Sequence, residues 1–117
     1  KHILEDVKPD AMIIEDVFSL QKYPKSGISL GQVSGVILLA AHQCRVPVRE
    51  VAVREVKQVL TGNGNADKCQ LEVCVRQRLG HGRPIKPSHA SDALALALLG
   101  VYRADQQQSE AVFCTLY

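Results

Sequence analysis

The sequence predicts an α/β fold with two short parallel strands and four helices. Two runs of apolar and β-branched residues, "AMIIE" at 11–15 and "VPVREVAV" at 46–53, are typical of strands. A segment of helical length at 28–43 separates them, and strands that are joined through a helix usually run parallel. Two strands make a poor sheet by themselves, so we interpret the chain as part of a larger fold.

Three further helices are predicted after the second strand. They cover 54–64, 66–79 and 88 to about 103. Gly62 is suited to end the first of these, whereas Asn65 and Ser88 are suited to cap the two that follow. The polar stretch "ADQQQSE" at 104–110 is then a linker, and "AVFCTLY" at 111–117 is an apolar tail.

Composition favours one globular domain and excludes several classes of protein. The 117 residues are 46% hydrophobic and 22% charged, which argues against disorder. The longest apolar run, at 36–41, is too short for a membrane span, and the N-terminus lacks the layout of a signal peptide. The cysteines are Cys44, Cys69, Cys74 and Cys114. Their spacing fits no zinc site, so we expect reduced thiols and a cytoplasmic protein.

Charge is distributed unevenly along the chain, although the net charge is only +2. Residues 45–86 hold nine Lys and Arg against four Asp and Glu, a net charge of +5. A basic segment of this kind favours an anionic partner, although a solvated surface would give the same count.

Three residues form a candidate metal site. Glu15 ends the first strand, and ligands bind at the carboxyl ends of parallel strands. His89 and Asp92 lie three residues apart in the predicted first turn of the last helix, so they face one side. Carboxylate oxygens are the ligands that a hard cation such as Mg²⁺ prefers, so Glu15 and Asp92 would suit it. The alternative is that Asp92 interacts only with the helix dipole and that the other two are surface residues.

Four segments taken together resemble one protein family. They are "IIEDVF" (13–18), "SLGQVSGV" (29–36), "REVKQVLTGNGNADKCQ" (54–70) and "HASDALALA" (89–97). In this order and spacing they are similar to the RuvC-type Holliday junction resolvases, over about residues 5–103. The resemblance implies a ribonuclease H-like fold and a Mg²⁺-dependent endonuclease, with Mn²⁺ as a substitute. It also implies a homodimer that acts on four-way DNA junctions in recombination and repair, and a branch-migration helicase as a further partner.

The same resemblance implies a role for each matching residue. Glu15 and Asp92 match catalytic acids of the family, and His89 stands where members carry either Asp or His. Phe18 matches an aromatic residue that stacks on a base near the crossover. Lys57 and Lys68 match lysines placed near the scissile DNA backbone, and both lie in the basic segment that the charge count identifies. The helix at 28–43 matches the helix through which members dimerise.

One departure from the family leaves the function of this chain open. The family's sheet opens with three strands, the first of which carries a catalytic Asp, and the chain has no counterpart to them. Residues 1–8 match instead the end of the helix before the 11–15 strand. We therefore expect an N-terminally incomplete nuclease domain at 1–104 and a tail at 105–117. The alternatives are a DNA-binding or dimerisation module without activity, or an α/β fragment in which the acids are incidental.

Overall fold

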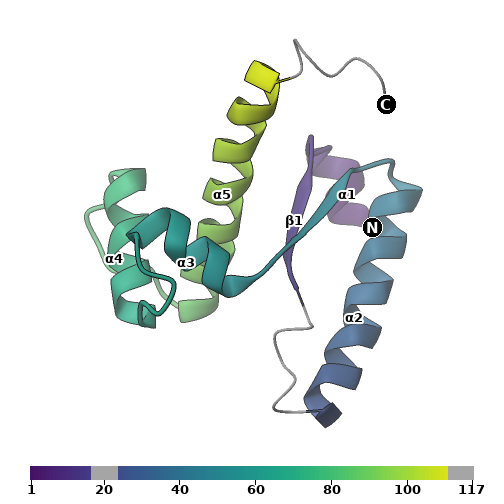
Figure 1. The fold of residues 1–117 in the computed structure, drawn as a ribbon. Coiled ribbons are helices and arrows are strands. Elements are labelled where there is room, and N and C mark those ends of the chain that lie inside the picture. Colours follow the sequence, from purple (N-terminus) through teal and green to yellow (C-terminus); the bar gives the residue numbers. More distant parts are fainter. Residues whose placement is uncertain (17–23, 111–117) are drawn as a thin grey trace. The chain divides into compact units, whose positions relative to one another are not determined.

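A computed structural model describes residues 1–16 and 24–110, with side chains outside 24–26 and 107–110 (Figure 1). Its elements are α1 (His2–Val7), β1 (Met12–Glu15), α2 (Pro24–Gln43), β2 (Val48–Val51), α3 (Val53–Thr61), α4 (Lys68–Leu79) and α5 (Ser88–Glu110). They form two compact units, one up to Val53 and one from Arg54 onward. The two predicted strands are confirmed, and the four predicted helices are preceded by the short α1.

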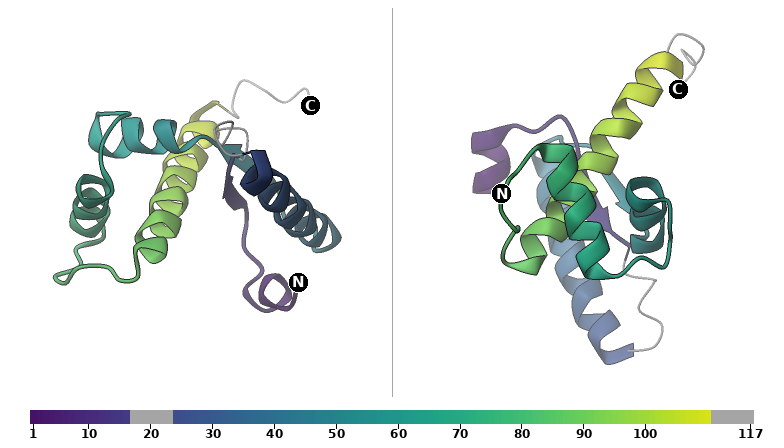
Figure 2. Two further views of the ribbon diagram at one scale, coloured as in Figure 1. Left: turned by 90° about the horizontal axis from the view of Figure 1, so that it is seen from below. Right: turned by 90° about the vertical axis from the view of Figure 1, so that its left-hand side faces the viewer.

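The first unit contains a parallel sheet of two strands. Met12 of β1 lies opposite Val48 of β2, and Glu15 lies opposite Val51. Because parallel strands cannot be joined by a tight turn, the chain returns through α2 before it enters β2 (Figures 1 and 2). The two strands therefore end at the same edge of the sheet, and Glu15 is the last residue of β1.

Helix α2 begins at Pro24, earlier than the predicted start at residue 28. Proline is favoured at the first position of a helix, since it has no N–H to leave unpaired there and its φ angle already suits the helix. Many apolar side chains of α2 are exposed in the structure. They are Ile28, Leu30, Val33, Val36, Ile37 and Leu39. The described part of the first unit therefore leaves an apolar helix surface uncovered.

The second unit is built around α4 and α5, which lie side by side (Figure 2). Each of its three helices contributes buried apolar side chains to one core. These are Val56 and Leu60 of α3, Leu71 and Val75 of α4, and Ala95 and Leu99 of α5. This core is aliphatic, in keeping with the 4% of aromatic residues in the sequence.

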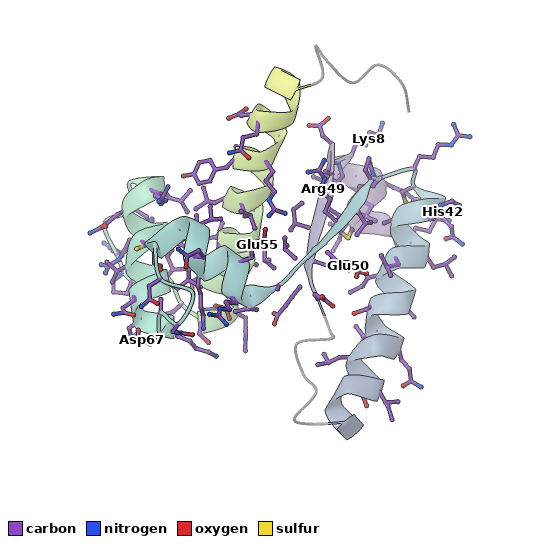
Figure 3. The ribbon with its side chains drawn as sticks, in the orientation of Figure 1. Lys8, His42, Arg49, Glu50, Glu55 and Asp67 are labelled. Atoms are coloured by element: carbon purple, nitrogen blue, oxygen red, sulfur yellow. The ribbon has the colours of Figure 1, made fainter. Side chains whose placement is uncertain are left out.

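Polar contacts join the three helices around this core. Glu55 of α3 pairs with Arg103 of α5, and Figure 3 shows Glu55 on α3. Arg78 of α4 donates one hydrogen bond to the Tyr102 hydroxyl and another to the Leu60 carbonyl, both of 2.9 Å. Its guanidinium also lies over the Tyr102 ring, 5.4 Å from the centroid. One arginine therefore connects the end of α3 with both α4 and α5.

The cap of α4 differs from the predicted one. The helix begins at Lys68, and its N-cap is Asp67 rather than Asn65 (Figure 3). The Asp67 carboxylate accepts a 2.8 Å bond from the Gln70 N–H, and Gln70 Oε1 accepts a 3.0 Å bond from the Asp67 N–H. This reciprocal capping box satisfies two N–H groups at once, which gives the later start an advantage over a cap at Asn65.

The last helix is longer than predicted. Helix α5 starts at Ser88 itself and continues to Glu110, so the prediction of a linker at 104–110 is wrong. Alanine, glutamine and glutamate are good helix formers, and a helix that already exists extends easily through them. The division of the chain at residue 104 stays a prediction, but a break there would fall inside α5. The tail at 111–117 lies outside the described residues. No helix in the described ranges is long and apolar enough to cross a membrane.

Candidate functional site

Glu15 lies where the strand-end argument placed it. It is the last residue of β1, its side chain is exposed, and its backbone is in register with Val51. The next residue, Asp16, donates its N–H to the Val51 carbonyl at 2.8 Å. The sheet therefore fixes the backbone that presents this carboxylate at the carboxyl edge, where parallel sheets bind ligands.

His89 and Asp92 both lie near the start of α5, but not in the same turn. The helix starts at Ser88, so Asp92 is its fifth residue, and the first turn contains no acidic side chain. The prediction that both lie in the first turn is therefore wrong for Asp92. The spacing of three residues still places them on one side of the helix, with His89 exposed and Asp92 partly buried.

The three predicted ligands belong to different units. Glu15 is part of the first unit, and His89 and Asp92 are part of the second. Within the described residues of either unit, no three His, Cys, Asp or Glu side chains gather into a group that could hold a metal. A metal site of the predicted composition would need carboxylates from both units. Its assembly from Glu15, His89 and Asp92 stays a prediction.

The chain that leads into α5 is held by α4. Glu72 Oε1 accepts a 3.0 Å hydrogen bond from the Ile85 N–H, in the loop before α5. The same oxygen lies 3.2 Å from Arg76 Nε, an ion pair without the angle of a hydrogen bond, since Arg76 Nε has no hydrogen-bond partner in the structure. Glu72 therefore ties the approach to His89 and Asp92 to the neighbouring helix.

The two predicted DNA-contacting lysines flank a single loop in the second unit. Lys57 lies in α3 and is partly buried, and Lys68 is the exposed first residue of α4. The third predicted DNA contact, Phe18, lies outside the described residues. Sequence reasoning missed Asp67 and Gln70, whose capping box places Lys68 at the helix start. The pattern "DKCQ" was the available signal, because an Asp followed three residues later by Gln is typical of such a cap.

A pocket of about 800 Å³ adjoins Lys68 within the second unit. It lies between the start of α4, the loop before α5 and the start of α5. Its lining residues are Lys68, Cys69, Glu72, Pro84, Ile85, Lys86, Pro87, Ser88 and Ser91. Two ammonium groups thus border a largely apolar hollow beside the helix that carries Asp92.

Comparison with curated proteins identifies similar sequences of known family. The crossover junction endodeoxyribonuclease RuvC of Carboxydothermus hydrogenoformans is 41% identical over 98 residues, covering 84% of this chain and 61% of that protein. The RuvC protein of Rhodopirellula baltica is 37% identical, covering 88% of this chain and 58% of that protein. The chain thus spans about 60% of the length of these relatives.

Solved structures give the same result for the fold. Thermus thermophilus RuvC matches with a TM-score of 0.73 at 32% identity, covering 88% of this chain and 59% of that one. The same protein in complex with a Holliday junction substrate matches with a TM-score of 0.82 at 33% identity, covering 91% and 64%. The expected ribonuclease H-like fold is confirmed by these matches.

A family model matches nearly the whole chain rather than one motif. The model for crossover junction endodeoxyribonuclease RuvC aligns with residues 1–100, which include both strands and the start of α5. This chain belongs to the RuvC family.

Proposed function

We propose that this chain is part of a metal-dependent endonuclease that resolves Holliday junctions. The observation that carries the proposal is the match to Thermus thermophilus RuvC in complex with a Holliday junction substrate, with a TM-score of 0.82. The similar sequences are crossover junction endodeoxyribonucleases by name, which supports phosphodiester hydrolysis as the reaction. We propose a cytoplasmic location, because the spacing of the four cysteines fits no zinc site and suggests reduced thiols.

The donor chemistry of the predicted site fits a hard divalent cation. Glu15 and Asp92 would hold the metal through carboxylate oxygens, and His89 would be a further ligand or would orient the attacking water. Mg²⁺ is the expected ion, and Mn²⁺ accepts the same donors. When bound, such a metal supplies an activated water and stabilises charge on the leaving oxygen. Glu15 is exposed and Asp92 only partly buried, so both carboxylates are accessible to an ion.

The lysines have a different task from the acids. Lys57 and Lys68 would bind phosphates on either side of the loop that separates them, which positions the DNA without reading its sequence. Phe18 follows the strand that carries Glu15 and would stack on a base near the crossover. The protein would then select the junction by its shape rather than its sequence. The lysines would position the DNA strand, and the acids would hold the metal that supports its cleavage.

A second candidate function is a DNA-binding module without nuclease activity. Its proposed DNA contacts, Lys57 and Lys68, both lie in the second unit and do not depend on Glu15 in the first. Such a module would keep the lysines and the dimer surface but would not hydrolyse DNA. Binding and cleavage therefore have to be measured separately.

We also propose that the protein acts as a homodimer through α2. The exposed apolar side chains of this helix offer a surface that water disfavours. Two active sites, one in each subunit, would cut two of the four strands of a symmetric four-way junction. A branch-migration helicase is the proposed further partner, which would present the junction to this dimer.

Asp92→Asn should remove cleavage while leaving junction binding intact. The amide keeps the shape of the side chain but removes the charge that holds the metal, so the cleavage rate in Mg²⁺ should fall at least about 100-fold. Asp105→Asn, on the same helix, should cleave within about twofold of the unmodified chain. Cleavage by Asp92→Asn at the normal rate would contradict the catalytic role. Binding of junctions without cleavage by the unmodified chain would support the binding module instead.

Lys57→Ala and Lys68→Ala should each weaken junction binding regardless of sequence. Each lost phosphate contact should make the dependence of log K on log salt shallower by about 1. Fluorescence anisotropy over a salt series measures both quantities, and Lys1→Ala, which removes an exposed lysine at the N-terminus, is the control. An unchanged slope for both variants would mean that the two lysines are solvated surface groups.

Val36→Glu should shift the protein from dimer towards monomer. Val36 is 69% exposed on α2, and a carboxylate there would have to be buried, uncompensated, in the proposed interface. Val101→Glu makes the same change at an exposed valine on α5 and should leave the dimer intact. Light scattering over a concentration series gives the answer. A monomer at every concentration in the unmodified chain would overturn the dimer proposal.

A further inference from the structure

The loop between the two candidate DNA-contacting lysines is held by its own hydrogen bonds. This spacer loop runs from Gly62 to Asp67, between α3 and α4. All six of its backbone N–H groups are satisfied within the second unit. Gly62 donates to the Gln58 carbonyl (3.0 Å), Asn63 to Thr61 Oγ1 (3.0 Å), Gly64 to Gln58 Oε1 (3.0 Å), Asn65 to Asn63 Oδ1 (2.9 Å), Ala66 to the Asn63 carbonyl (3.0 Å) and Asp67 to Gln70 Oε1 (3.0 Å).

These hydrogen bonds limit the ways in which the loop could bind DNA. A short loop with glycines at a helix boundary often binds phosphate through free backbone N–H groups. In the spacer loop those N–H groups already have acceptors, so they are not available to a phosphate. Side chains on either side of the loop remain able to bind phosphate, among them Lys57, in the last two turns of α3, and Lys68, the first residue of α4. The loop therefore acts as a spacer between two cations.

Gln58 makes the contacts that fold the loop back onto α3. Its Nε2 donates to the Gly62 carbonyl at 3.1 Å, and its Oε1 accepts from the Gly64 N–H at 3.0 Å. One exposed side-chain amide thus bonds to the loop on both sides of Asn63. Gln58 also follows Lys57 directly, and the Thr61 hydroxyl donates to the Lys57 carbonyl at 2.7 Å.

Two glycines allow the backbone conformation of the spacer loop that Gln58 stabilises. Gly62 has a φ of +77°, a left-handed conformation in which a side chain is strained. A Cβ on Gly64 would lie 3.0 Å from Arg54 Cγ and 3.2 Å from Arg54 Nε, closer than ordinary contact. The backbone can therefore turn sharply after α3 and pass close to its first residues, and the Gln58 amide then fixes it there.

We infer that Gln58 is a positioning residue that sets the placement of Lys68 relative to Lys57. Gln58 itself does not touch the DNA. It keeps the spacer loop in one conformation, so that the two ammonium groups meet two phosphates without first having to be ordered. The inference rests on the proposed function, in which both lysines bind the junction backbone.

The first test measures the loop without DNA. Gln58→Met keeps the length of the side chain and its helix propensity but removes both hydrogen bonds. Amide exchange followed by NMR should show the Gly64 N–H exchanging roughly 10-fold faster, because its acceptor is gone. Gln58→Glu retains an oxygen acceptor and should keep Gly64 protected. Gln77→Met, an exposed glutamine of α4, is the matched control and should leave Gly64 unchanged.

The second test is a double-mutant cycle on junction binding. Gln58→Met alone should weaken binding about 3- to 10-fold, the range expected for one or two lost hydrogen bonds. In a Lys68→Ala background the same change should cost less than about twofold, because a residue that acts through Lys68 has nothing left to position. A residue that only stabilises the fold would weaken binding equally in both backgrounds.

The outcomes separate this inference from the proposed function. Unchanged exchange at Gly64 in Gln58→Met would overturn the inference whatever the DNA result. Faster exchange would also overturn the inference if Gln58→Met weakened junction binding equally in the unmodified chain and in Lys68→Ala. In that case, weaker binding by Lys68→Ala alone would still support the proposed DNA contact. If neither Lys57→Ala nor Lys68→Ala weakened binding, the proposed contact would be wrong and the inference with it.

Discussion

The parallel pairing of β1 with β2 is the constraint on which the rest of the first unit depends. Parallel strands cannot be joined by a hairpin, so the chain between Glu15 and Val48 has to return along the sheet, which it does through α2. The pairing also brings the carboxyl ends of both strands to one edge. Glu15 stands at that edge opposite Val51, and the chain enters α3 two residues later, at Val53. A candidate metal ligand, Glu15, and the start of α3, which carries Lys57, thus lie at the same edge of the sheet.

Sequence reasoning found both strands from their composition and their flanking residues. The runs that became β1 and β2 are short, β-branched and bounded by breakers, and few other structures fit such a pattern. The ends of the helices were harder to predict, because the decisive contacts there are polar and local. At the start of α4, for example, the cap is Asp67 rather than Asn65, and Asp67 and Gln70 bond each other's backbone N–H groups. Hydrophobic periodicity carries no trace of that choice.

The other errors have the same kind of cause. A stretch such as 104–110 has no apolar face, so its pattern does not distinguish a linker from the exposed end of a helix. In the structure it continues α5, because extending a helix that has already formed is easy. The candidate site was predictable in part, since a strand end and a spacing of three residues can be read from the chain. The side chains that hold the spacer loop were not, because Gln58 lies on an exposed helix surface where any polar residue would be expected.

We propose that Glu15 and Asp92, from different units, hold one metal ion, and this remains to be tested. Paramagnetic Mn²⁺ tests it directly, because it broadens the NMR signals of nuclei close to where it binds. Titrated into the protein, Mn²⁺ should broaden the amide signals around Glu15 and those around Asp92 at the same concentrations. In Asp92→Asn both sets should then need a higher concentration of the ion. Broadening around Glu15 that is unaffected by Asp92→Asn would mean that the two carboxylates do not share an ion.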